Sequence, residues 1–312
     1  MNKKKRLVII DSNSVIHRAF HALPPLTDKK GNLSNAVYGF FMVFFKTIRE
    51  LNPDFIVACF DFPAPTFRHK KYKKYKDKRP RAPKELYDQI LKVKQVLESL
   101  SVSVFEKEGF EADDLIGTLG HKFSLKQVFP EIETIILSSD SDVLQLINEN
   151  TRVCSLKKGV SEATLYDKKA VKEKYGFDPE QMIDYKALRG DPSDSIPGAP
   201  GIGEKTAVDL IKKFATVDEL YEHLERDSKE AQSLKPKLKE ILIKSKDQVL
   251  FSRELAQIEL NVPLKFNLND CRWRGCNREQ AAEALKDFGF ESIIKHLPEA
   301  GENNAGGELR LW

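Results

Sequence analysis

The sequence is 312 residues long, 41% hydrophobic and 31% charged, yet its formal net charge is only +4. This composition supports one large or two modest folded domains. It argues against a protein that coats nucleic acid simply through overall positive charge. The four cysteines form no C-x-x-C pair, and no apolar stretch reaches signal-peptide or membrane-span length, so we expect a cytoplasmic protein without structural zinc.

In chain order, three apolar runs predict buried β-strands at residues 7–10, 55–60 and 134–137. The runs are apolar throughout rather than alternating, which favours a parallel sheet covered on both faces. Helical periodicity between and around them predicts helices at 35–51, 83–100 and 112–123. Strands that alternate with helices predict an α/β domain, with a parallel-rich central sheet flanked by helices.

The character of the sequence changes near residue 190, after which no further strand is predicted. The helical patterns that follow lie at 203–214, 217–225, 234–244, 246–256 and 278–288. We therefore predict an α/β core over 1–190 and a helical region over 191–297. The segment 298–312 is rich in Pro, Gly and Asn at its start and is expected to be a flexible tail.

Acidic residues fall in five clusters, three of which follow predicted strands. The nine acids are Asp11, Asp61, Glu111, Asp113, Asp114, Asp140, Asp142, Asp191 and Asp194. Any one of them alone is explained as a turn or a helix cap. Carboxylates gathered at the carboxyl edge of a sheet, however, repel one another unless cations lie between them. An all-oxygen set selects Mg²⁺ or Mn²⁺, and two such ions support phosphodiester hydrolysis.

A basic segment, residues 66–84, follows the second strand and its acid. It holds ten Lys or Arg residues and one acid, with Phe67, Tyr72 and Tyr75 interleaved. Cations that follow phosphates, with rings that stack on bases, are typical of sites that hold single-stranded nucleic acid. The alternatives are a solvated loop or a localisation signal.

The segment 196–207, IPGAPGIGEKTA, predicts a glycine-rich hairpin between two helices. Its backbone N–H groups and the following helix N-terminus suit a phosphate that is held without reading base sequence. The candidate binding residues are Gly198, Gly201, Ile202, Gly203, Lys205 and Thr206. An ordinary helix–helix turn is the alternative interpretation.

Six motifs occur together in one order: RLVIIDSNSVIHRAFHALPPL, NAVYGFFMVF, FRHKKYKKYKDKRP, GFEADDLIGTLG, SSDSDVLQL and LRGDPSDSIPGAPGIGEKTA. On these motifs the chain resembles the 5′-nuclease domain of bacterial DNA polymerase I, within the wider flap-endonuclease family, over residues 6–297. The resemblance implies a PIN-like α/β core, a helical arch at about 66–84, and a helix-hairpin-helix region.

The resemblance also implies roles for individual residues. All nine acids match the family's two-metal site, and the hairpin matches its duplex-binding element, which often holds K⁺. Arg68, Tyr75, Lys76 and Arg79 match phosphate-contacting positions, and Lys76 and Arg79 would stabilise charge at the scissile phosphate. Ser12, the pair Ser138-Ser139 and Ser195 depart from the family's usual residues, which puts rate in question more than activity.

From these features we expect a nucleoid-associated, monomeric 5′→3′ exonuclease and flap endonuclease that removes primers or flaps during replication and repair. Its substrate would be DNA with a 5′ flap or 5′ end, or an RNA primer paired to DNA. Two rival functions stay open: a ribonuclease on the related small nuclease fold, and a non-catalytic binder of branched DNA. The chain would be either free-standing or a fragment, with a separate DNA polymerase as one expected partner.

The last five residues, ELRLW, resemble the short peptide that docks on the bacterial sliding clamp. An apolar tip on a polar tail favours a binding function, with Leu309, Leu311 and Trp312 as the contacting residues. The alternative is a tip that packs on its own domain.

Overall fold

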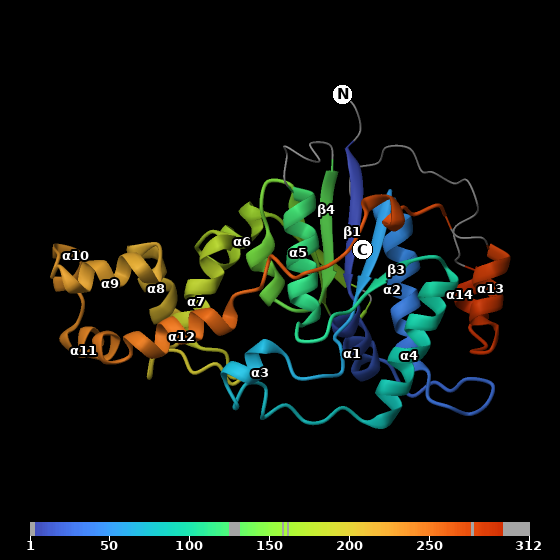
Figure 1. Cartoon of the computed structure of the whole chain (residues 1–312), viewed down its shortest axis with the longest axis horizontal. Coiled ribbons are helices and arrows are strands. Elements are labelled where there is room, and N and C mark those ends of the chain that lie inside the picture. Colours follow the sequence, from blue (N-terminus) through green and yellow to red (C-terminus); the bar gives the residue numbers. More distant parts are fainter. Residues whose placement is uncertain (1–3, 125–131, 158, 161, 276–277, 296–312) are drawn as a thin grey trace.

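The computed structural model describes residues 4–124, 132–157, 159–160, 162–275 and 278–295 (Figure 1). The proposed clamp-binding residues Leu309, Leu311 and Trp312, with the tail 298–312, lie outside these described residues. Within the described part, no helix combines the length and the apolar character needed to cross a membrane.

A six-stranded sheet forms the centre of the molecule, with strand order β3-β2-β1-β4-β5-β6. The strands are β1 (Lys5–Asp11), β2 (Phe55–Cys59), β3 (Ser103–Phe105), β4 (Ile132–Ser138), β5 (Thr151–Lys157) and β6 (Glu162–Tyr166). All neighbouring pairs are parallel except β5 with β6. The parallel-rich sheet and the three predicted strands are therefore confirmed, and β1 lies between β2 and β4 at the centre of the sheet.

Three strands were not predicted, and each lacks the uniform apolar run that identified the others. β3 has only three residues, all half-buried, and β5 and β6 carry exposed or half-buried polar residues among their apolar ones. β6 is an edge strand, and one side of an edge strand meets water, which permits such a mixed pattern.

Two helical layers cover the sheet, and alternate side chains of β1 face each layer in turn. Leu7 and Ile9 pack with α5 (Ala112–Ser124), α6 (Lys168–Tyr175) and α7 (Met182–Arg189). Val8 and Ile10 pack with α1 (Ser12–Ala22), α2 (Asn35–Leu51) and α4 (Lys84–Ser99). Burial of both faces explains why the strand is apolar at every position.

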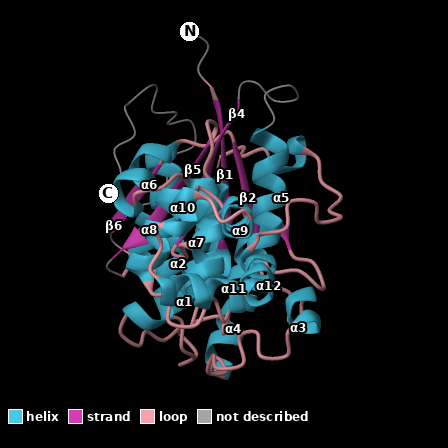
Figure 2. Ribbon diagram, turned by 90° about the vertical axis from the view of Figure 1, so that its left-hand side faces the viewer, coloured by secondary structure: helices cyan, strands magenta, loops and turns pink. Residues whose placement is uncertain are grey.

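A helical region extends from one side of the sheet domain (Figures 1 and 2). It comprises α8 (Glu204–Phe214), α9 (Val217–Glu225), α10 (Lys229–Gln232), α11 (Pro236–Lys244) and α12 (Lys246–Ala256). The chain then returns to the sheet domain, where α13 (Arg278–Lys286) and α14 (Glu291–Lys295) pack beside α4 and α2. The helix predicted at 278–288 exists, but it lies on the sheet domain rather than beside the hairpin.

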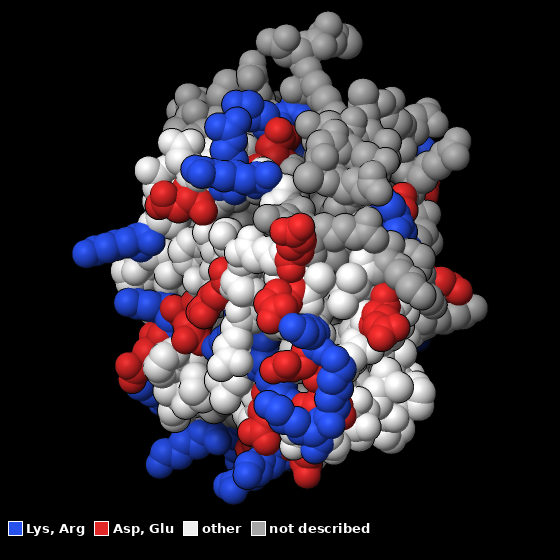
Figure 3. Space-filling view, turned by 90° about the vertical axis from the view of Figure 1, so that its right-hand side faces the viewer, with Lys and Arg blue, Asp and Glu red and all other residues white. Residues whose placement is uncertain are grey.

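The face that carries α4, α13 and α14 shows acidic and basic side chains interspersed among its described residues (Figure 3). The basic segment 66–84 contains one short helix, α3 (Phe67–Lys71), followed by turns up to the start of α4. The predicted arch is thus helical over only part of its length.

Candidate active site

Three acids lie together because three parallel strands end at one edge of the sheet. Asp11 is the last residue of β1 and is paired in register with Cys59, two residues before Asp61. On the other side, Ile10 is paired with Leu137, three residues before Asp140. The topology therefore places these carboxylates around the carboxyl end of β1, where α/β sheets bind ligands.

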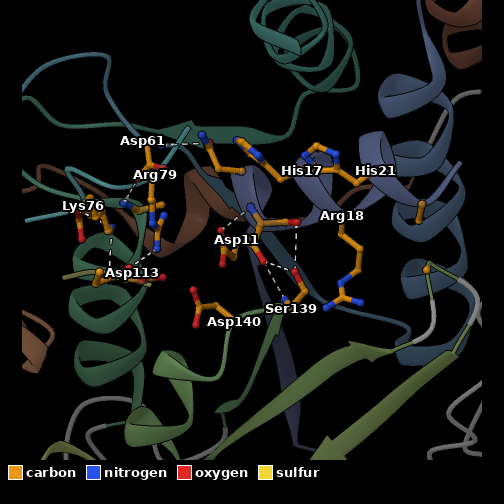
Figure 4. A pocket seen from close by; sticks show the side chains of 17 residues that line it. Asp11, His17, Arg18, His21, Asp61, Lys76, Arg79, Asp113, Ser139 and Asp140 are labelled. Atoms are coloured by element: carbon orange, nitrogen blue, oxygen red, sulfur yellow. Dashed lines mark hydrogen bonds and ion pairs between the residues drawn. The ribbon is translucent and has the colours of Figure 1, made fainter. Parts of the chain in front are cut away.

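A pocket of about 530 Å³ opens at this edge (Figure 4). Its acidic lining residues are Asp11, Asp61, Glu111, Asp113, Asp140 and Asp194, and its basic ones are His17, Arg18, His21, Lys76 and Arg79. The acids come from β1, the loops after β2 and β4, the start of α5 with the residue before it (Glu111), and the loop after α7. Six of the nine predicted acids thus surround one cavity, with Lys76 and Arg79 beside them.

Asp11 caps a helix and also lines the pocket, so the cap does not exclude the predicted metal role. Its Oδ1 accepts a hydrogen bond from Ser14 N at 3.1 Å and so caps α1, while its Oδ2 accepts from Ser138 Oγ at 2.6 Å. Burial, opposed by these two hydrogen bonds, raises the pKa of Asp11 to about 7, and the neighbouring Asp140 adds to the rise. Burial and the charges of Asp11 and Asp140 raise the pKa of Asp113 well above its usual value.

Glu111 and Asp194 lie at the side of the pocket where the basic segment crosses it. Lys76 Nζ is 2.7 Å from Glu111 Oε1 and 3.8 Å from Asp194 Oδ2, and Arg79 also pairs with Asp194. The Tyr75 hydroxyl donates to both carboxylates. Although burial acts to raise it, the pKa of Glu111 is lowered on balance by the charge of Lys76.

Asp142 and Asp191 do not line the pocket, because a lysine that the sequence reasoning overlooked lies between them. Lys186 on α7 is 4% exposed, pairs with Asp142 and has its Nζ 2.9 Å from Asp191 Oδ2. Burial acts to lower the pKa of Lys186, but these two carboxylates raise it. The sequence did contain a clue to this pairing, since Lys186 lies five residues before Asp191.

Arg68, Asp114 and Tyr75 are placed differently from their predicted roles. Asp114 is fully buried, faces away from the pocket, and forms a two-bond ion pair with Arg68, with both N–O distances 2.8 Å. Arg68 is 2% exposed and Tyr75 3% exposed. In this structure neither side chain reaches a surface where it would touch DNA, and Asp114 does not line the pocket.

The hairpin is formed as predicted, with two kinds of residue in it. Gly201, Gly203 and Lys205 are exposed and Thr206 is half-buried, whereas Ile202 is buried in the core. Gly198 has a φ of +60°, and a Cβ there would lie 2.2 Å from the backbone nitrogen of Gly190. That close approach, rather than phosphate contact, accounts for glycine at this position.

The pocket also contains a basic side that the sequence reasoning did not identify. His17, Arg18 and His21 line it from α1, the helix that starts directly after Asp11 (Figure 4). Burial lowers the pKa of His17. Helical spacing from Asp11 places these residues near the acid, so the signal was present in the motif.

The donor set suits a hard divalent cation, since the pocket is lined by six carboxylates. Three of these, Asp11, Asp61 and Asp113, have raised pKa values. Among the described residues, no three His, Cys, Asp or Glu side chains already lie in an arrangement that would hold a metal ion. Glu111 and Asp194 are instead turned towards Lys76 and Arg79. Ion binding would therefore require some of these side chains to exchange protein cations for the metal.

Two family models match the chain: "5′-3′ exonuclease, N-terminal resolvase-like domain" over residues 6–176, and "5′-3′ exonuclease, C-terminal SAM fold" over residues 177–279. DNA polymerase I of Bacillus subtilis is 42% identical over 99% of this chain, which spans 34% of that polymerase. A 5′-3′ exonuclease of Aquifex aeolicus is 33% identical over 94% of this chain and 95% of its own length. This chain thus spans about a third of the polymerase but nearly all of the shorter relative.

Solved structures share the fold at low sequence identity. A bacteriophage T5 flap endonuclease in a complex with DNA and metal ions matches with a TM-score of 0.63 at 19% identity, covering 94% of this chain and 96% of that one. The catalytic core of Rad2 in complex with DNA substrate matches with a TM-score of 0.53 at 16% identity, covering 94% and 92%. These likenesses establish the sheet and the helical region as one shared architecture.

Proposed function

We propose an activity for this chain, which belongs to the 5′-3′ exonuclease family. It is a metal-dependent 5′→3′ exonuclease and flap endonuclease that acts on DNA. The observation that carries the proposal is one pocket that is lined by six carboxylates together with Lys76 and Arg79. Carboxylates bind hard cations, and cations of the protein bind phosphate, so the pocket offers both halves of a phosphodiester-cleaving site.

Each side of the pocket has its own proposed task. Asp11, Asp113 and Asp140 would hold the divalent ions, with Asp61 beside them. Two bound Mg²⁺ or Mn²⁺ ions would supply an activated water and neutralise charge on the leaving oxygen. Lys76 and Arg79 would bind the non-bridging oxygens of the scissile phosphate as they leave Glu111 and Asp194, which frees those two carboxylates for the cations.

The hairpin supports duplex binding by the same protein. Gly201 and Gly203 expose backbone N–H groups at the start of α8, and Lys205 lies exposed beside them. These groups suit a phosphate of the duplex backbone, with K⁺ as a further proposed ligand of the hairpin carbonyls. The duplex would then be held at the helical region while its 5′ strand enters the pocket.

Two rival functions are less well supported. The related ribonucleases usually lack the basic arch and the hairpin, both of which this chain has. A non-catalytic binder of branched DNA would be expected to have lost some of the acids, and all nine are carboxylates here.

Cleavage of an end-labelled 5′-flap DNA in Mg²⁺ tests the proposal, with wild type, Asp113→Ala and the control Asp88→Ala. Asp88 is an exposed acid on α4, away from the pocket. We expect wild type and Asp88→Ala to cut near the flap junction, and Asp113→Ala and wild type in EDTA to leave the substrate intact. Binding without cutting by wild type would favour the non-catalytic binder, and preferential cutting of an all-RNA flap would favour the ribonuclease.

A further inference from the structure

Arg68 has every guanidinium hydrogen engaged inside the protein. Its acceptors are Leu255 O at 3.0 Å, Gln257 O at 2.7 Å, Glu111 Oε2 at 3.3 Å, and Asp114 Oδ1 and Oδ2 at 2.8 Å each. A guanidinium has five N–H donors, so none remains for a phosphate of DNA. The side chain therefore works within the protein.

Asp114, the partner of Arg68, is equally saturated. Its Oδ2 accepts a hydrogen bond from Glu111 N at 3.0 Å, and its Oδ1 accepts from Glu259 N at 2.9 Å, besides the two bonds from Arg68. Asp114 thereby joins α5 to the strap, which is the extended segment 257–262 that follows α12. Its fully buried oxygens are already satisfied, so a metal ion would have to displace existing bonds.

The strap lies directly on α5 and on the 3₁₀ turn at Asp142–Leu146. Ile258 N donates to Gln145 Oε1 at 3.1 Å, and Val262 N donates to Thr118 Oγ1 at 3.0 Å. At Gly117 a Cβ would lie 2.5 Å from Ile258 Cγ2, so the glycine permits this close packing. The strap is thus held to the same helix that presents Asp113 to the pocket.

The helix before the strap, α12, also contacts the hairpin. Gly198 N donates to Ser252 Oγ at 3.1 Å, and Gln248 Nε2 donates to Gly198 O. The last carbonyls of a helix have no partner within the helix, and a cation there also favours the helix dipole. Arg68 supplies a hydrogen-bond donor and a positive charge to the C-terminal end of α12, because its Nε donates to Leu255 O.

The start of the basic segment rests on this end of α12. The rings of Tyr72 and Phe251 meet edge to face with centroids 5.5 Å apart. Leu255 belongs to the same buried cluster as Tyr75, whose hydroxyl bonds Glu111 and Asp194. A continuous path of contacts therefore runs from the hairpin through α12 to the residue next to Lys76.

We propose that Arg68 and Asp114 are positioning residues that lock the C-terminal end of α12 against the start of the basic segment. The pair keeps DNA held at the hairpin in register with Lys76 over the pocket. Its effect on cleavage rests on the proposed function, whereas its effect on the basic segment does not. Arg68 touches no DNA in this proposal, and Asp114 holds no metal.

The salt dependence of DNA binding separates a positioning arginine from a phosphate contact. We expect Arg68→Lys to lower the single-turnover rate of flap cleavage by about 100-fold, as sub-ångström to ångström misplacement does. Arg68→Gln, which removes the positive charge, should leave the slope of log affinity against log salt unchanged. The control is Lys74→Ala, which removes an exposed cation of the same segment. If that lysine meets a phosphate, its slope falls by about one. A slope change of that size in Arg68→Gln would overturn the proposal.

Metal-dependent melting separates a positioning carboxylate from a ligand without requiring activity. We expect Asp114→Asn to keep the rise in melting temperature that Mg²⁺ gives the wild type, and Asp113→Asn to lose most of it. Hydrogen exchange of residues 67–79 should become faster in both Arg68→Lys and Asp114→Asn. Loss of the Mg²⁺ response in Asp114→Asn, or unchanged exchange in both variants, would overturn the proposal.

The proposed function and this inference fail in different ways. Wild type that never cuts in Mg²⁺ or Mn²⁺ would defeat the first, while faster exchange in the two variants would still support the second. If the wild type cuts, but Arg68→Lys and Asp114→Asn show the same cleavage rates and hydrogen exchange as the wild type, only the second is defeated.

Discussion

The acids at the carboxyl edge of the sheet fall into two groups that the fold treats in opposite ways. The unpaired pocket acids, Asp11, Asp61, Asp113 and Asp140, have no ion pair with a protein cation among the described residues. The paired acids are neutralised inside the protein: Glu111 and Asp194 by Lys76, Asp142 and Asp191 by Lys186, and Asp114 by Arg68.

The difference explains how so much negative charge is kept in one place. Burial raises the pKa of Asp11 to about 7, whereas Lys186 helps to lower the pKa of Asp191 to about 2 against the effect of burial. Asp142 is an exception among the paired acids, because burial and the charge of Asp140 raise its pKa to about 7 although Lys186 acts to lower it. For Asp11 and Asp113, burial and then the neighbouring carboxylates disfavour the charged form, and a bound divalent cation would offset that cost.

The largest expected effect comes from neutralising a pocket acid. Asp113→Asn should lower cleavage by about 1000-fold or more, since an ion contributes several kcal/mol to transition-state stabilisation. The metal-free protein should not become less stable, because the substitution removes a repelling charge. Cleavage rates and melting curves in EDTA check both points, and a clear fall in the melting temperature would break the comparison.

Removing the cation of a paired acid should instead lower the stability of the metal-free protein. Lys186→Met leaves two half-buried carboxylates uncompensated and should lower the free energy of unfolding by about 3 kcal/mol, the lower end of the range for breaking a buried ion pair, with partial recovery in Mg²⁺. The matched control is Lys172→Met, which removes an exposed lysine paired with Asp178 and should change little. Denaturant unfolding in EDTA measures both, and equal effects of the two substitutions would count against an internal neutralising role for Lys186.

Mg²⁺ should stabilise the wild type, because the ion binds the folded pocket better than the unfolded chain. At a hundredfold excess over its dissociation constant the gain is about 2.7 kcal/mol, and EDTA should reverse it. Asp11→Asn should lose most of this gain, whereas the control Asp88→Asn should keep it. A thermal shift titration decides, and an equal response of all three proteins would remove the pocket acids as ligands.

The pH dependence of metal-free stability sharpens the comparison further. A carboxyl whose pKa is raised in the folded state loses stability as pH rises from about 4 towards about 7, whereas one whose pKa is lowered loses it only as pH falls towards about 2. Half-buried His17 and His69, with lowered pKa values, titrate in the same window with the opposite sign.

The difference between wild type and Asp11→Asn isolates the carboxyl. Between about pH 5 and pH 8 in EDTA, wild type should lose on the order of 2 kcal/mol relative to the variant. Melting curves of the two proteins at both pH values measure it, and parallel curves would show that Asp11 is not strained.

Sequence reasoning located the sheet and the acids but not the direction in which each acid points. Asp113 and Asp114 are consecutive on a helix, so their side chains diverge by about 100° and only one of them can face a given pocket. Which one does so is decided by the packing of α5 on the sheet and the strap. Pairing partners such as Lys186 and Arg68 likewise depend on contacts distant in sequence.

The strap and α7 also determine how the helical region is attached. The region leaves the sheet domain through α7 and rejoins it through 257–262, where Val262 and Glu259 bond to α5. Besides these two crossings, residues of α8 and α9 share one buried hydrophobic cluster with α5 and β1. A shared hydrophobic core resists relative motion of two parts more than chain crossings alone would. We therefore expect the helical region to keep a fixed orientation on the sheet domain, so that a duplex bound at the hairpin would meet the pocket at one angle.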